Sequence, residues 1–165
     1  MIRSIQDFVA AYTAEREKTM QLLQAVTQDS LSTRVGTEGR TLGYIAWHIV
    51  ATIPEMMNKT GLKLAELEGA EAPDNVEEIR SAYAAASQEL LDTVERSWAD
   101  GELTVTDNMY GEDWPRSQTL LVLLTHEIHH RAQLTVLMRQ AGLRVPGIYG
   151  PAREDWADYG MEAHS

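Results

Sequence analysis

Apolar residues recur at alternating steps of three and four along much of this chain, the spacing typical of amphipathic α-helices. The pattern predicts four long helices, over residues 5–26, 42–59, 74–98 and 118–141. The links between them lack a helical period, although residues 103–106 and 108–110 could form a short hairpin or an extended loop. We therefore predict an all-α fold, a four-helix bundle whose long links allow two successive helices to run parallel.

The predicted helix starts carry side chains suited to capping, namely Ser4, Thr41, Asp74 and Ser117. Asp74 is followed three residues later by Glu77, a variant of the capping box. Pro54 lies inside the second helix and predicts a kink there, because it removes one backbone hydrogen bond. The third helix is expected to be purely structural.

Two polar residues, Glu15 and Thr19, interrupt the apolar seam of the first helix. We interpret them as solvated positions at the edge of the seam. The alternative is that Glu15 faces an interior pocket, where it would act as a partner of the site or as a base.

Length and composition limit the classes of function. The 165 residues fit a single domain, 1–165, and the absence of Cys excludes disulfides and thiolate ligands. A formal net charge of −11 argues against nucleic-acid binding, since phosphates would be repelled. Neither a signal peptide nor a membrane-spanning run is apparent, so we expect a cytoplasmic protein without membrane contact.

The strongest chemical pattern is the stretch from Thr125 to Arg131, which holds three of the five histidines. At about 100° per residue, His126 and His130 lie about 40° apart on one helix face. Leucines precede and follow them on that face, which indicates that it points inward. Two imidazoles in such a place favour a shared divalent metal.

His48, near the core-facing side of the second helix, is the candidate third ligand. We expect Tyr44 and Gln133 to line the pocket around the three histidines. His129 is an alternative to His130, which we prefer because residues four apart stack better on a helix.

The same residues also spell His-Glu-x-x-His, the pattern of zincin metalloproteases, in which Glu127 would be the general base. The longer metzincin form would need Gly and His where the chain has Gln133 and Val136. A ferritin-like site would need a second Glu-x-x-His pattern, which the other predicted helices lack. Glu127 and Glu15 are the candidates for a catalytic proton acceptor.

Several segments together resemble the DinB-like (DinB/YfiT) superfamily: 41–48, 124–133, 137–142 and 146–150. The resemblance implies a four-helix bundle with up-down-down-up topology, often dimeric. It also implies a divalent metal held by one His of the second helix and a His-x-x-x-His pair of the fourth. The matching positions are His48, His126 and His130.

The resemblance further implies a metal-dependent thiol S-transferase that uses bacillithiol or mycothiol, and a hydrolase is the other enzymatic possibility. We expect the metal to be Zn, Ni, Fe or Mn. We expect no second, C-terminal domain of the kind found in some thiol-dependent isomerases. The alternative is a non-catalytic, dimeric metal-binding or stress-response protein. A homodimer and a small-molecule ligand are expected in either case, with Met57 and Leu91 as guesses for exposed interface residues.

Overall fold

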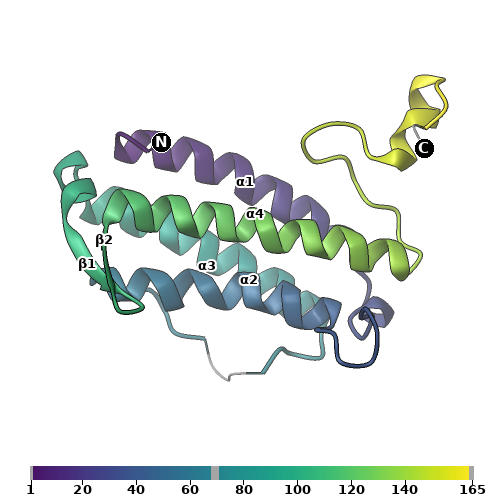
Figure 1. Ribbon diagram of the computed structural model, residues 1–165, viewed down its shortest axis with the longest axis horizontal. Helices are drawn as coiled ribbons and strands as arrows, with labels where there is room; N and C mark the ends of the chain where they lie inside the picture. The colour runs from purple at the N-terminus through teal and green to yellow at the C-terminus, as the bar shows by residue number, and fades with distance from the viewer. Residues whose placement is uncertain (1, 68–70, 164–165) are drawn as a thin grey trace.

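Four long helices dominate the structure, a computed structural model that describes residues 2–67 and 71–163 (Figure 1). They are α1 (Ile5–Ala25), α2 (Leu42–Met57), α3 (Val76–Ser97) and α4 (Arg116–Gln140). A small antiparallel hairpin, β1 (Thr106–Met109) and β2 (Glu112–Pro115), precedes α4. Short 3-10 helices are η1 (Gln28–Ser30), η2 (Asn58–Thr60), η3 (Asp100–Thr104) and η4 (Arg153–Tyr159).

The long helices pack around one apolar core. Helices α1 and α2 each contact both α3 and α4, so α4 lies against α1 on one side and α2 on the other. The predominantly helical fold is confirmed, whereas the up-down-down-up order stays a prediction. Met57 and Leu91 were wrong guesses for an interface, because both side chains are buried in the core. No helix within the described ranges is long and apolar enough to cross a membrane.

Two of the four predicted helix caps are present. The Ser4 hydroxyl accepts from the Asp7 N–H at 3.0 Å, and the Thr41 hydroxyl accepts from the Tyr44 N–H at 3.1 Å. These bonds satisfy N–H groups that the first turn of a helix leaves free. Helix α2 then continues through Pro54 to Met57.

The other two starts were predicted slightly wrongly. Asn75, not Asp74, caps α3 by accepting from the Glu77 N–H at 2.9 Å. Helix α4 begins at Arg116 without a side-chain cap, so Ser117 lies inside the helix. The guanidinium of Arg116 pairs with Asp107 at 2.8 Å, which joins the first turn of α4 to the hairpin.

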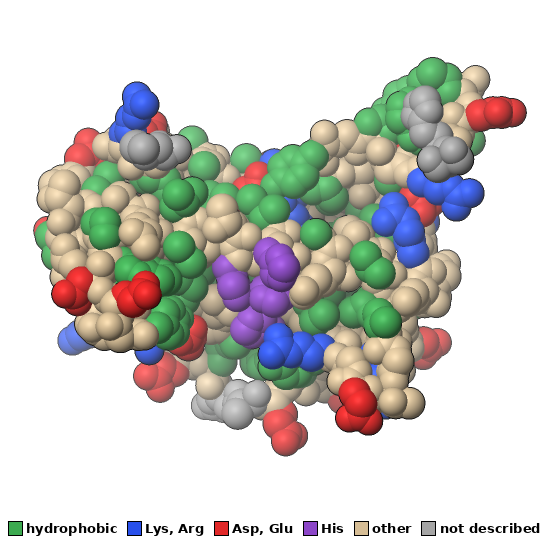
Figure 2. Space-filling view, in the orientation of Figure 1, with side chains coloured by type: hydrophobic (Ala, Val, Ile, Leu, Met, Phe, Trp, Pro, Cys, Tyr) green, Lys and Arg blue, Asp and Glu red, His purple; other side chains and the backbone are tan. Residues whose placement is uncertain are grey.

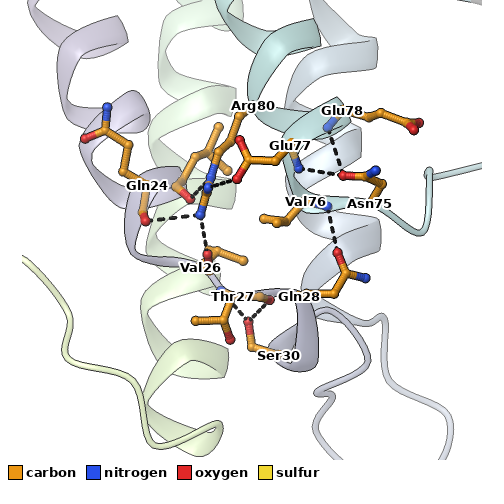
Figure 3. Close-up of polar contacts among 11 residues, drawn as sticks. Gln24, Val26, Thr27, Gln28, Ser30, Asn75, Val76, Glu77, Glu78 and Arg80 are labelled. Atoms are coloured by element: carbon orange, nitrogen blue, oxygen red, sulfur yellow. Dashed lines mark hydrogen bonds and ion pairs between the residues drawn. The ribbon is translucent and has the colours of Figure 1, made fainter.

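The end of α1 is joined to the start of α3 by side-chain contacts (Figure 3). Arg80 donates to the carbonyl oxygens of Leu23, at 3.0 Å, and Gln24, at 3.1 Å. The Gln28 side-chain oxygen accepts from the Val76 N–H at 3.0 Å. Terminal backbone groups of both helices are satisfied in this way.

The hairpin turns at Tyr110 and Gly111, whose φ angles are 58° and 91°. Two successive positive φ values are what a tight hairpin turn requires, and Gly adopts them without strain. The paired strands flank this turn, with Met109 opposite Glu112. The predicted hairpin therefore exists, but both of its strands were placed several residues too early.

Candidate metal centre

Three histidines from two helices converge on one place. His48 comes from α2, and His126 and His130 lie one turn apart on α4; one ring nitrogen of each lies within 4.8 Å of the others. The His48 ring centroid is 5.1 Å from that of His126 and 4.5 Å from that of His130. Figure 2 shows the imidazoles gathered on one face, with a basic side chain beside them. We call these three residues the histidine cluster.

The spacing within the cluster fits a shared cation. The Nε2 atoms of His126 and His130 are 3.1 Å apart. Two nitrogens that bind one Zn²⁺ ion at about 2.1 Å in a roughly tetrahedral arrangement lie about 3.1 to 3.4 Å apart. The three residues are therefore positioned to hold a metal ion.

Gln133 fixes the ring of His130. Its side-chain oxygen lies 2.8 Å from His130 Nδ1, and since that oxygen can only accept, Nδ1 carries the proton. The lone pair of His130 is then on Nε2, the atom that faces His126. A hydrogen bond to the far nitrogen of a ligating imidazole is the usual way to orient a metal site.

The imidazoles are held in their neutral form. Burial, together with the charges of neighbouring histidines, lowers the pKa of His126 to about 4. Burial also lowers the pKa of His48 and of His130, with Arg40 contributing to both shifts. Neutral rings keep the lone pairs that a cation requires.

His130 and His129 lie in different surroundings. His130 is buried within the cluster, whereas His129 is exposed and its Nε2 lies 3.1 Å from the Gln133 amide nitrogen. The predicted pocket residues both lie at the site. Gln133 contacts His130, and the half-exposed Tyr44 ring is stacked on His48 at 6.2 Å.

Glu127 points away from the cluster, toward α1 and α3. Its carboxylate accepts from the Thr19 hydroxyl at 2.6 Å and from the Tyr83 hydroxyl at 2.5 Å. Burial raises the pKa of Glu127, and these hydrogen bonds offset only part of that shift. Thr19 is fully buried, so its interpretation as a solvated edge residue was wrong. Helix α3 also does more than pack, because Tyr83 supplies one of the two donors.

Glu15 is likewise not a solvated residue. It is 8% exposed and pairs with Arg131, a fully enclosed guanidinium that also donates to Thr19 at 3.1 Å. Burial alone would raise the pKa of Glu15, but hydrogen bonds from Lys18, Tyr149 and Arg131 outweigh it and lower the pKa. The structure therefore places Glu15 in an ion pair between α1 and α4.

These contacts form one buried network across α1, α3 and α4. Its members are Glu15, Thr19, Tyr83, Glu127 and Arg131. Sequence reasoning gave no role to Tyr83, to Arg131 or to Tyr149, whose hydroxyl contacts Arg131 at 2.6 Å. The available signal was Arg131 itself, which follows Glu127 by four residues and so shares its helix face.

Residues 1–163 of the chain match the family model of the DinB family. An uncharacterized protein of Bacillus subtilis (strain 168), YrdA, is 39% identical over 164 residues, which cover 99% of this chain and 98% of that protein.

Two solved structures share the fold. A DinB-like protein from Bacillus cereus ATCC 10987 is 37% identical, with a TM-score of 0.87 over 90% of this chain and 100% of the other. A DinB-like protein from Bacillus subtilis, YjoA, is 16% identical, with a TM-score of 0.71 over 88% of this chain and 99% of the other. At that lower identity the likeness concerns the fold alone.

Proposed function

The chain belongs to the DinB family, and we propose that it is a metal-dependent enzyme whose divalent cation is bound by the histidine cluster. The observation that carries the proposal is the convergence of three neutral imidazoles from α2 and α4. The up-down-down-up bundle expected of the family is part of the same proposal.

An open coordination position favours catalysis over a structural role. Among the described residues, the group that could hold a metal at this place comprises His48, His126 and His130 and no carboxylate. Three protein ligands with a free position are typical of catalytic sites, whereas structural sites are closed by four. The half-exposed Tyr44 beside His48 marks the side from which a small molecule would enter.

We assign the reaction to thiol S-transfer, with a low-molecular-weight thiol of the bacillithiol or mycothiol type as co-substrate. A divalent cation, when bound, lowers the pKa of a thiol that reaches it and so favours the thiolate. The thiol would release its proton to solvent, and the thiolate sulfur would attack an electrophilic carbon. The new C–S bond then forms as the bond to the leaving group breaks, with the electron pair going to the leaving group. Gln133 orients His130, and the neutral rings of the histidine cluster would hold the cation.

A second function is a non-catalytic metal-binding or stress-response protein, acting as a homodimer. It is favoured by the position of the carboxylates, since Glu15 and Glu127 are both used in the buried network. With neither carboxylate directed at the cluster, a base for proton transfer would have to come from the solvent or the substrate.

The zincin alternative receives no support from the geometry. A protease of that type needs the Glu of His-Glu-x-x-His to activate water beside the metal. Here the Glu127 carboxylate is held by Thr19 and Tyr83 on another side of α4.

Metal binding is tested by titrating chelator-treated protein with Zn²⁺, Ni²⁺, Fe²⁺ and Mn²⁺. We expect one ion per chain, and His126→Ala should weaken binding by more than about 100-fold, beyond the 10- to 100-fold typical of changes outside the ligand set. His129→Ala, which alters an exposed neighbour on the same helix, should bind as the wild type does. Equal binding by wild type and His126→Ala would refute the proposal.

Turnover is tested separately. The metal-loaded protein should conjugate bacillithiol or mycothiol to an electrophilic chloronitroarene, and His126→Ala should not. Tight metal binding without conjugation of any thiol tried would favour the non-catalytic function.

A further inference from the structure

A groove of about 340 Å³ lies beside the histidine cluster, between the loop that precedes α2 and the second half of α4. Its lining includes Val35, Arg40, Ile45, Gln133, Val136 and Leu137. Four of these side chains are aliphatic. Val35 and Val136 are 57% and 53% exposed, so the groove offers apolar surface to an incoming molecule.

Two residues of the groove, Gln133 and Arg40, connect it to the cluster. Gln133 lines the groove and also accepts from His130 Nδ1 at 2.8 Å. The Arg40 guanidinium lies 5.0 Å from the centre of the Tyr44 ring, which is stacked on His48. A molecule in the groove would therefore lie next to the imidazoles.

Arg40 is a free cation at this junction. In the parts of the chain that the structure describes, its guanidinium is paired with no carboxylate, and it lies over the Tyr44 ring. By contrast, Arg116, Arg131 and Arg139 each pair with Asp or Glu. In a chain of net charge −11, an arginine left without an acidic partner beside a site is suited to an anionic ligand.

The loop that carries Arg40 is held in place before any ligand binds. The Leu42 N–H donates to the Thr33 carbonyl oxygen at 2.8 Å, which ties the loop to the start of α2. A Cβ atom at Gly39 would collide with the backbone carbonyl oxygen of Val35, so the close turn before Arg40 requires glycine. A preformed groove binds with a smaller loss of conformational entropy.

We propose that this groove binds a small carboxylate with an apolar arm. The arm lies against the aliphatic side chains of the groove, and the carboxylate meets the guanidinium of Arg40. Atoms next to the carboxylate then face the histidine cluster. The proposal rests on the proposed function in one respect, because it treats this carboxylate as a substrate or co-substrate of the metal site. Binding of the carboxylate in the groove does not depend on the proposed function.

The test is calorimetric titration of hexanoate into chelator-treated and Zn²⁺-loaded protein at neutral pH and low salt. The wild type should bind hexanoate both without metal and with Zn²⁺. It should bind hexan-1-ol, which lacks the charge, more weakly than hexanoate. Arg40→Gln should weaken hexanoate binding about tenfold or more, as expected for a hydrogen bond to a charged group, and leave hexan-1-ol binding unchanged. Val136→Ser should weaken the binding of both.

The matched control is Arg34→Gln. Arg34 lies in the same loop, and its guanidinium contacts the Thr37 carbonyl oxygen at 3.3 Å rather than the groove. The Arg34→Gln variant should bind hexanoate as the wild type does. Because binding is measured without metal and without turnover, a failed metal or transferase assay leaves this result intact. Hexanoate binding that needs Zn²⁺ and ignores Arg40→Gln would overturn the proposal, as would no binding at all.

Discussion

Helix α4 carries two polar regions on neighbouring residues, and their surroundings differ. The histidine cluster uses His126 and His130, which face α2; His126 remains partly accessible to solvent, whereas His130 is buried. The buried network uses Glu127 and Arg131, which are each 2% exposed and face α1 and α3. In both regions the helix contributes a pair of residues four apart.

The difference lies in whether the groups that carry charge already have a partner of opposite charge. In the network, Arg131 donates to the Glu15 backbone oxygen at 2.9 Å, pairs with the Glu15 carboxylate and donates to Thr19. In the cluster, ring nitrogens meet other ring nitrogens, and neutral imidazoles offer lone pairs without a cation. A closed set of opposite charges stabilises a fold, whereas a convergent set of acceptors is suited to binding. The following changes test that division.

The largest expected effect is on stability, from Arg131→Met. Removing one member of a buried ion pair costs about 3 to 5 kcal/mol, because the partner charge stays buried. Glu15 would keep Lys18 at 2.6 Å, which places the expected loss toward the lower end. Urea unfolding of the metal-free protein measures it.

The control for this change is Arg139→Met, two turns further along α4. Arg139 pairs with Glu154 at 3.1 Å on the surface, where an ion pair contributes about 1 kcal/mol or less. If the two variants lost the same free energy of unfolding, the network would have no special structural role.

The next effect is on metal affinity, from Gln133→Ala. The change removes the acceptor that orients His130, and such changes lower metal affinity about 10- to 100-fold. Gln133 is exposed, so the free energy of unfolding of the metal-free protein should stay within about 0.5 kcal/mol of wild type. Zn²⁺ titration and urea unfolding separate the two quantities. Gln140→Ala, an exposed glutamine on the same helix, should change neither, and equal Zn²⁺ affinity in both variants would contradict the role of Gln133.

The cluster was predictable from sequence because its signal is local. His126 and His130 share a face by helix periodicity, and His48 lies on a second helix whose own apolar stripe sets its direction. The caps Ser4 and Thr41 were equally local. The prediction of the cluster required in addition that the two helices be neighbours, and α2 and α4 are in contact.

The buried network was not predictable in the same way. A Glu or Thr that interrupts an apolar seam gives the same sequence pattern whether its side chain faces water or a distant partner. Glu15 and Thr19 bind partners more than a hundred residues away in the chain. The cap of α3 was misplaced because two suitable residues adjoin, since Asp74 and Asn75 are comparable N-caps. The hairpin was misplaced because Tyr110, unlike Gly111, carries no sequence signal for its positive φ angle.

The smallest effect is the pH dependence of stability in the metal-free protein. The pKa of His126 is about 4 in the folded chain, against an ordinary value near 6.5 in the unfolded chain. Between these values the unfolded chain binds a proton that the folded chain does not. The free energy of unfolding should therefore fall as pH drops from about 6.5 toward 4.

His126→Gln isolates this contribution, because it removes the titrating ring and its repulsion of His48 and His130 while Glu15 and Glu127 titrate in both proteins. Urea unfolding with a chelator present, at pH 7.5, 6.0 and 4.5, should show a shallower decline for the variant. His126 is partly exposed, so solvent reduces the size of the difference. Parallel declines in the two proteins would mean that the ring protonates as readily in the folded chain as in the unfolded one. The histidine cluster would then lack the enclosure that distinguishes it from the exposed His129.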